Sequence, residues 1–401
     1  MVQGLFIWLV TLLVSFWMIS HLQKRYPFLD RRLMIVLFFY HSLLAVAYYV
    51  YALANPSDSH LYFFRTANHV RGEAWFDYYG VSTTFIDFVA YPLINFLGFT
   101  YEGAMAFFAW LGFLGFLYFY IFFKERIRTS PKIFGQDGIW LLFLLPNLHF
   151  WSSSLGKGSL IFYGFGLFFY ALNKPALRIW ALILGGWIIF QIRPHIFYVV
   201  MVAVAIGYSF STKGVSMAYR VAILVVAGFL IAYVYQDVLA LTGLEDESML
   251  DPLISHRARE LTKATSGIDI ANYTFPEKLF AFWFRPLFFD APGALGFIVS
   301  FENLFYLMIF SYMILRGGMK YLLTADAITK TCLFTFLGVS FALAQISGNL
   351  GLAMRQKSQV MILMMFVILK YMDDQKMIQW KKSWARQRKI KVKMQDLRLK
   401  T

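Results

Sequence analysis

The chain has 401 residues, of which 59% are hydrophobic, 20% are aromatic and only 15% are charged. Soluble domains carry about 25% charged residues, and many apolar runs of this chain approach the roughly 20 residues that cross a bilayer. The composition therefore excludes an ordinary soluble protein. It predicts an all-α, polytopic integral membrane protein with about 11 transmembrane helices.

Hydropathy predicts the spans in chain order. The first apolar run, GLFIWLVTLLVSFWMIS, has no basic residue before it and no small-residue cleavage site, so it predicts an uncleaved anchor. The run 84–98 contains Asp87 and Pro92, which favour a re-entrant or interfacial helix over a full span. The predicted spans are 4–21, 33–54, 101–123, 139–150, 159–173, 179–191, 196–211, 220–236, 294–315, 328–346 and 358–372.

The distribution of basic residues predicts the orientation. With 11 spans, the loops on the C-terminal side and the tail hold 26 of the 37 lysines and arginines, when Arg220, Lys330 and Lys370 near span ends are counted with them. Because basic residues accumulate on the inner side, we expect the N-terminus outside and the C-terminus inside. Residues 1–375 then form the membrane-embedded domain, and 376–401 form a basic amphipathic tail on the cytoplasmic side. Anionic lipid would attract that tail by about 1 kcal/mol per basic residue.

The predicted outer loops collect ionisable residues, whereas the inner loops are short and merely basic. An ionisable group at a span end is costly and usually pairs with another group or serves a site. Each also has a simpler interpretation, such as helix capping by Asp58 or snorkelling of Lys157 to lipid headgroups. The candidate site residues are Asp58, Arg65, His149, Lys157, Arg193, His195, Arg257, Arg285, Glu302 and Arg355.

The predicted outer segment 237–293 contains one helical pattern. In the stretch 247–263, Arg257 falls within the apolar face, at 100° per residue. This face consists of Leu250, Leu253, Ile254 and Leu261. The pattern predicts an interfacial helix on the outer surface, with Arg257 directed toward the spans. There it could hold a phosphate, whose oxygens match the planar guanidinium, or pair with Asp58 or Glu302.

Several of these stretches resemble a known group of membrane enzymes. Asp58 followed by Tyr62 in NPSDSHLYFF resembles the first outer loop of GT-C-type membrane glycosyltransferases. The stretches PNLHFWSSSLGKGSLIF, QIRPH, FRPLFFDAPG, SFENL and GLAMRQKSQ resemble bacterial O-antigen and exopolysaccharide polymerases. The resemblance covers roughly residues 30–370. Relatives are expected to carry an acidic residue after the Lys of LGK, where this chain has Gly158.

The resemblance implies glycosyl transfer at the outer face of the bacterial cytoplasmic membrane. The substrate would be a saccharide on a polyprenyl (di)phosphate, and other components of a polysaccharide assembly system would be partners. Asp58 would act as base or hold a divalent ion, with Arg193 and His195 as further catalytic candidates. The leaving phosphate would be neutralised by the cations Lys157, Arg193, Arg257, Arg285 and Arg355. We expect no nucleic-acid partner and assign no cofactor.

Two other classes of function remain open from the sequence. A transporter or flippase of lipid-linked saccharides would also need many spans and cations. It would, however, place charge at mid-membrane and show repeated halves. A non-catalytic scaffold of a surface-polysaccharide or secretion assembly would tolerate alanine at Asp58 or Arg193.

Overall fold

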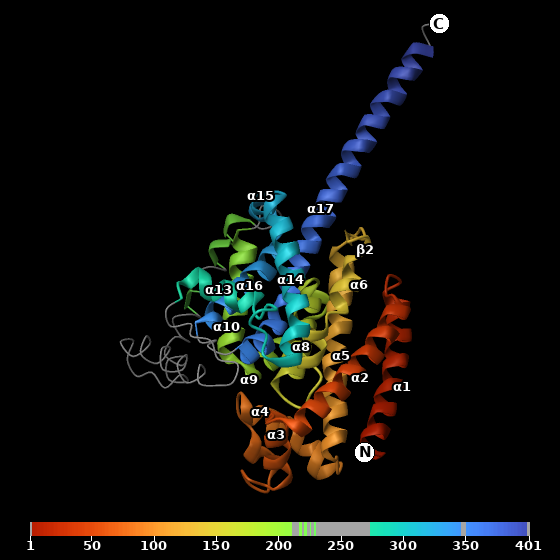
Figure 1. The fold of residues 1–401 in the computed structure, drawn as a ribbon. Coiled ribbons are helices and arrows are strands. Elements are labelled where there is room, and N and C mark those ends of the chain that lie inside the picture. The colour runs from red at the N-terminus through yellow and green to blue at the C-terminus, as the bar shows by residue number, and fades with distance from the viewer. Residues whose placement is uncertain are drawn as a thin grey trace.

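The computed structural model describes residues 2–210, 273–345 and 350–398, together with 216–218, 220–222, 225, 228 and 229, and side chains as far as residue 390. The described chain is almost entirely helical, as the composition predicts (Figure 1). A two-stranded antiparallel pair, β1 (Lys132–Ile133) with β2 (Gln136–Asp137), links two helices.

Six helices are long and apolar enough to cross a membrane. They are α1 (Val2–Arg25), α2 (Arg31–Ala54), α5 (Tyr101–Arg126), α14 (Gly293–Leu315), α16 (Ala327–Ala344) and α17 (Leu350–Arg398). The chain is therefore a multi-pass membrane protein by the length and composition of its helices. The ends of these helices agree with the predicted spans to within a few residues, except for α17.

Three predicted spans form shorter apolar helices. These are α8 (Lys157–Leu172), α9 (Ile179–Ile192) and α10 (Pro194–Ser209). At 1.5 Å per residue, helices of 14 to 16 residues reach at most about 24 Å, which is less than the hydrocarbon core. Pro194 ends α9 and occupies the first position of α10. The amide of the first helical residue has no partner within the helix, so a proline, which has no amide hydrogen, is tolerated there.

The predicted span 139–150 is wrong. This stretch forms two six-residue helices, α6 (Gly138–Phe143) and α7 (Pro146–Trp151). Pro146 occupies the first position of α7, and a proline cannot continue a preceding helix. The apolar composition of the stretch reflects burial inside the bundle, where Phe143 and Leu148 have almost no exposed surface.

Two helices formed by the segment that follows α2 lie at one end of the molecule. They are α3 (Asp58–Ala67) and α4 (Thr83–Tyr91), and the 3-10 turn η1 (Trp75–Tyr78) lies between them. A π-turn, η2 (Pro92–Phe96), follows α4. The run 84–98 is therefore too short and too broken to span, as Asp87 and Pro92 indicated.

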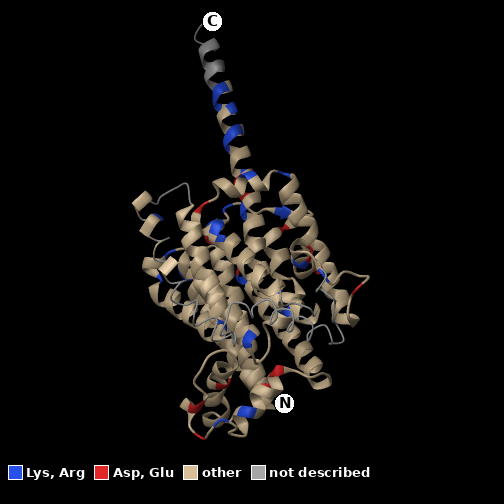
Figure 2. Ribbon diagram, turned by 90° about the vertical axis from the view of Figure 1, so that its left-hand side faces the viewer, with Lys and Arg blue, Asp and Glu red and all other residues tan. Residues whose placement is uncertain are grey.

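The two ends of the chain lie at opposite ends of the molecule (Figure 1). The N-terminus lies on the side of α3 and α4. Residues 350–398 form one continuous helix, so the outer loop predicted around Arg355 is instead the start of α17. The last part of α17 extends away from the bundle and carries Lys and Arg along its length (Figure 2). The remaining helices in the described part of the chain are η3 (Pro175–Leu177), α13 (Phe275–Phe284) and α15 (Gly318–Thr324).

The core lies where α5, α8 and α17 meet. A side chain at Gly166 would bring its Cβ to 2.6 Å from the backbone oxygen of Gly115. Only glycine allows this approach, and small residues serve the same purpose between membrane helices in general. Phe122 of α5 packs against Phe366 of α17 with ring centroids 4.5 Å apart. These contacts fix α17 against the helices that carry the candidate site.

Candidate functional site

Four of the sequence-predicted residues come together beside α3. Arg355, in the second turn of α17, donates from Nη1 to Asp58 Oδ2 at 2.7 Å. Lys157, the first residue of α8, is within electrostatic reach of Arg193, Arg355 and Asp58. We call Asp58, Lys157, Arg193 and Arg355 the cation cluster. They come from residues as far apart as 58 and 355, so only tertiary packing brings them together.

The cation cluster carries three positive groups and one negative group. Lys157 and Arg193 are half-buried, whereas Asp58 keeps 50% of its side-chain surface exposed. Burial and then the charge of Arg355 lower the pKa of Arg193 to about 10. Burial and then Arg193 and Arg355 lower the pKa of Lys157, which lies outside the six candidate spans, to about 8. The site therefore disfavours the charged forms of Lys157 and Arg193, and these two groups would gain from a bound anion.

Glycine and aromatic side chains hold the Lys157 loop in place. Gly156 has φ +156, and a Cβ there would lie 3.2 Å from the ring of Tyr62. At Gly158 a Cβ would lie 2.1 Å from the backbone oxygen of Trp151. No side chain fits at 158 without moving this backbone, which accounts for the glycine at this position. Trp151 also lies 6.0 Å from the Arg355 guanidinium.

Arg65 lies next to the cation cluster but is paired elsewhere. Its Nε and Nη2 donate to the two carboxylate oxygens of Asp87 at 2.9 and 3.1 Å. Arg71 donates to the same carboxylate at 3.3 Å. Asp87 is fully buried, so these bonds explain how an acid fits inside the apolar stretch 84–98. The guanidinium of Arg65 lies 5.2 Å from the Tyr62 ring centroid.

Arg285 and Glu302 lie in a second polar group, around the start of α14. Arg285 pairs with Asp290 and donates to the Tyr273 hydroxyl at 2.9 Å. The buried carboxylate of Glu302 accepts from the Asn147 amide at 2.9 Å and from the Tyr306 hydroxyl at 2.5 Å. These partners meet its need for hydrogen bonds in an apolar setting.

Lys357 belongs to the same second group and was not singled out by the sequence analysis. It is fully buried, and its ammonium donates to Arg285 O and Asn303 Oδ1, both at 2.7 Å. Lys357 lies between the predicted spans 328–346 and 358–372, so hydropathy places it in an outer turn. The signal that could have found it is the helical continuation of the apolar run back to residue 350, which places Lys357 inside the bundle.

The remaining candidate residues have different positions. His149 is buried in the core, where its Nδ1 lies 2.9 Å from His41 Nδ1 and its ring stacks on Phe116. His195 is exposed at the second position of α10. Arg257, its predicted interfacial helix and most of the predicted span 220–236 lie outside the described residues. The roles predicted for these residues stay predictions.

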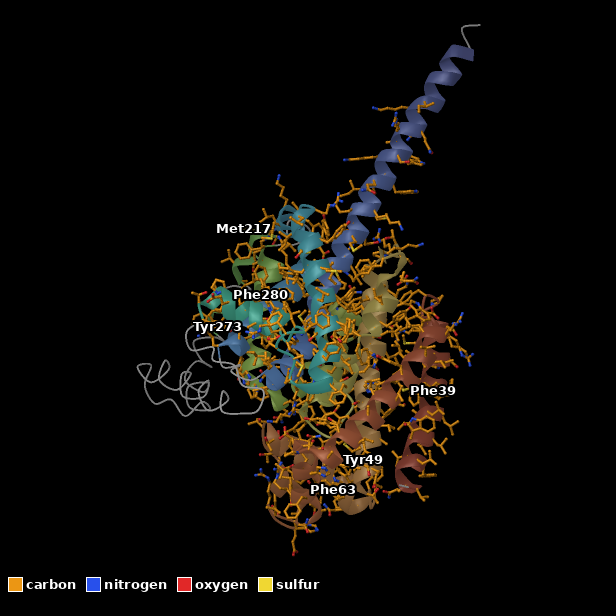
Figure 3. All side chains as sticks on the ribbon, in the orientation of Figure 1. Phe39, Tyr49, Phe63, Met217, Tyr273 and Phe280 are labelled. Atoms are coloured by element: carbon orange, nitrogen blue, oxygen red, sulfur yellow. The ribbon has the colours of Figure 1, made fainter. Side chains whose placement is uncertain are left out.

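An apolar cavity of about 480 Å³ lies between α1, α2 and α5. Its lining includes Phe39 and Tyr49 of α2 (Figure 3) and Glu102 of α5. No member of the cation cluster lines it. Within the described part of the chain, no group of three or more His, Cys, Asp and Glu residues is arranged to hold a metal ion.

Comparisons of the chain with protein-family models, with curated proteins and with solved structures find no match. The geometry of the cation cluster is therefore the basis for a functional proposal.

Proposed function

We propose that the protein transfers a glycosyl group from a polyprenyl (di)phosphate to a saccharide acceptor, at the outer face of the bacterial cytoplasmic membrane. The proposal includes an outer N-terminus and an inner C-terminus. The product would be a cell-surface polysaccharide. The observation that carries it is the gathering of Asp58, Lys157, Arg193 and Arg355 from four separate parts of the chain.

Each group has a role in this reaction. The acceptor hydroxyl oxygen would attack the anomeric carbon, and the bond from that carbon to the phosphate oxygen would break. Asp58 would accept the hydroxyl proton. The negative charge that develops on the leaving phosphate would be neutralised by the three cations. Arginine suits this task because its planar donors match two phosphate oxygens at once.

The ion pair between Asp58 and Arg355 suggests how the substrate prepares the site. The Arg355 and Asp58 side chains are bonded at 2.7 Å. A bound phosphate would compete for the Arg355 guanidinium and leave the Asp58 carboxylate free to accept a proton. Asp58 is half exposed and so accessible to an acceptor from the aqueous side.

The deciding experiment replaces Arg193 by Ala. Purified wild-type protein in nanodiscs is supplied with a polyprenyl-diphosphate oligosaccharide, and the formation of longer glycans is followed. We expect Arg193→Ala to reduce the rate at least 100-fold, because an electrostatic contact to the developing charge is lost. Arg316→Ala is the matched control, since Arg316 is exposed at the end of α14.

Two results would contradict the proposal. If Arg193→Ala and Asp58→Ala both kept wild-type glycan formation, a scaffold role would replace catalysis. If the protein moved the lipid-linked saccharide across vesicles without forming a glycosidic bond, it would be a transporter. Size-exclusion profiles of each variant show that the compared proteins are folded.

A further inference from the structure

Ser82 is one of three described non-glycine residues with a positive φ. Its φ is +65 and its ψ is −117, a conformation that costs energy for any residue with a Cβ and that often marks a functional position. Ser82 directly precedes α4, which begins at Thr83.

The hydroxyl of Ser82 does not cap the helix that it precedes. Serine at this position ordinarily accepts a hydrogen bond from the amides of the first turn, but Ser82 makes no side-chain cap bond to α4. Instead, Ser82 Oγ accepts from Lys157 Nζ at 2.8 Å. The backbone conformation therefore directs the hydroxyl away from its own helix and onto a member of the cation cluster.

The backbone of Ser82 contacts the segment that carries a second member of the cluster. Ser82 N donates to Gln191 O at 2.6 Å, two residues before Arg193. Gln191 Nε2 also donates to the Tyr79 hydroxyl at 2.9 Å, so the turn before α4 is bonded to the end of α9 twice. One residue thus bonds to the Lys157 ammonium with its side chain and to the Arg193 turn with its backbone.

Holding these two cations together is unfavourable without such restraints. Lys157 and Arg193 repel each other, and each is half-buried. A free lysine side chain would turn toward water or lipid headgroups. We propose that Ser82 is a positioning residue that keeps the Lys157 ammonium beside Arg193, and so pre-forms the anion-binding part of the site. This inference rests on the proposed function for its biological role, but the positioning is measurable without any substrate.

The test measures the acylation of Lys157 by an amine-reactive ester as a function of pH, with mass spectrometry of the peptide that contains Lys157. Only the neutral amine reacts, so the midpoint reports the pKa of Lys157. Ser82→Ala removes the acceptor and keeps the backbone bond. Ser82→Asn keeps a side-chain oxygen that can accept the hydrogen bond, and asparagine tolerates a positive φ, so it is the conservative rescue. Both are compared with wild-type protein in nanodiscs.

We expect the wild-type midpoint near pH 8, as the surroundings of Lys157 imply. Ser82→Ala should raise it by at least half a pH unit, because the freed side chain turns away from Arg193 and toward water, where the charged form is favoured, and Ser82→Asn should stay close to wild type. An unchanged midpoint in Ser82→Ala would overturn the inference, as would an equal shift in both variants.

Failure of this inference and failure of the proposed function are distinguishable. Suppose that Lys157→Ala kept full glycan formation while the Ser82→Ala midpoint still shifted. The positioning role of Ser82 would then be supported, and the proposal of glycosyl transfer at this cluster would be contradicted. If glycan formation required Lys157 but the midpoint were the same in wild type and Ser82→Ala, the proposed function would be supported and the positioning role of Ser82 would be contradicted.

Discussion

At the scale of single residues, Lys157 gives the site a dependence on pH. Burial and two neighbouring cations lower its pKa to about 8, so the side chain is mostly charged at pH 7 and mostly neutral at pH 9. Binding of an anion that needs this charge should therefore weaken as pH rises through 8. Calorimetric titration of inorganic pyrophosphate at several pH values measures the effect, and we expect about a tenfold loss of affinity between pH 7 and pH 9.

Lys157→Arg is the control for this pH dependence, because arginine stays charged throughout the range. A pyrophosphate affinity that falls equally in wild type and in Lys157→Arg would show that another group titrates.

Gly158 provides a second prediction at the residue scale. A Cβ at this position would lie 2.1 Å from Trp151 O, and a backbone atom cannot give way as a flexible side chain can. We expect Gly158→Ala to destabilise the protein by more than about 2 kcal/mol, as overpacking does in other cores. The measurement is the temperature at which the monodisperse peak is lost in fluorescence-detected size-exclusion chromatography.

Gly186→Ala is the matched substitution for Gly158→Ala. The nearest atom to a Cβ at Gly186 lies 3.4 Å away, on the side chain of Phe197, so this variant should behave almost like wild type. Equal stability of the two variants would mean that the Lys157 loop adapts easily.

At the scale of elements, the pairing of α3 with α4 depends on Asp87. Its buried carboxylate receives hydrogen bonds from both Arg65 and Arg71. Asp87→Asn removes the charge but keeps the shape, and it leaves two cations without their partner. We expect a destabilisation of about 3 kcal/mol, below the value for a fully buried pair because both arginines are partly exposed. Thermal unfolding of detergent-solubilised protein measures the loss.

The proper comparison for Asp87→Asn is Asp77→Asn. Asp77 is exposed and accepts the Ala74 amide at 3.0 Å, so its substitution should change the stability little. If Asp87→Asn unfolded at the wild-type temperature, the ion pairs would contribute little to the α3–α4 contact.

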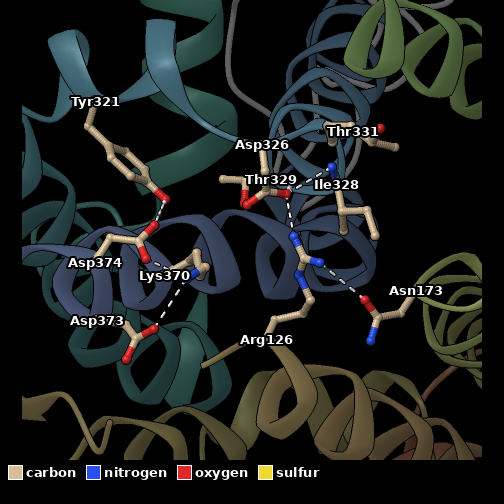
Figure 4. Close-up of polar contacts among 11 residues, drawn as sticks. Arg126, Asn173, Tyr321, Asp326, Ile328, Thr329, Thr331, Lys370, Asp373 and Asp374 are labelled. Carbon is tan, nitrogen blue, oxygen red and sulfur yellow. Dashed lines mark hydrogen bonds and ion pairs between the residues drawn. The ribbon is translucent and has the colours of Figure 1, made fainter. Parts of the chain in front are cut away.

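A second set of ion pairs joins elements at the opposite end of the bundle (Figure 4). Arg126 of α5 pairs with Asp326, which also caps the start of α16. Lys370 of α17 donates to Asp374 at 2.6 Å, and the Tyr321 hydroxyl of α15 donates to the same carboxylate at 2.9 Å. These bonds fix the point at which α17 leaves the bundle.

At the scale of the whole molecule, the opposite positions of the two chain ends lead to a topological prediction. With the N-terminus on the α3–α4 side and α17 emerging at the other end, an outer N-terminus places residue 401 in the cytoplasm. A fluorescent reporter that folds only in the cytoplasm should therefore be active when fused after Thr401. An export-dependent phosphatase fused at the same point should be inactive, and activity of the phosphatase would reverse the orientation.

The extension of α17 beyond the bundle corrects one picture drawn from the sequence. The basic tail does not begin as a separate element, because the helix runs without interruption from 350 to 398. Trp380 and Trp384 are both more than half exposed. In the structure the tail points away from the bundle (Figure 1), and its attraction to anionic lipid stays a prediction.

The sequence by itself determined the class of the protein and the approximate position of most helices. Apolar runs such as 101–123 are long enough for hydropathy alone to define them. Short elements were harder to predict, because composition cannot separate a span from a buried helix. The two helices on either side of Pro146 show this: they are as apolar as a span, but the proline interrupts the backbone hydrogen bonds.

Only the tertiary structure decided which polar residues meet. Asp58 and Arg355 are 297 positions apart, and no local pattern relates them. The same packing assigned Arg65 to Asp87, placed His149 against His41 in the core, and separated Arg285 and Glu302 from the cation cluster. The strained backbone conformation of Ser82 could not be predicted from the sequence either, because bonds to Lys157 and Gln191 maintain it. The type of a side chain determines which interactions it can make, and the packing of distant helices determines which partners it meets.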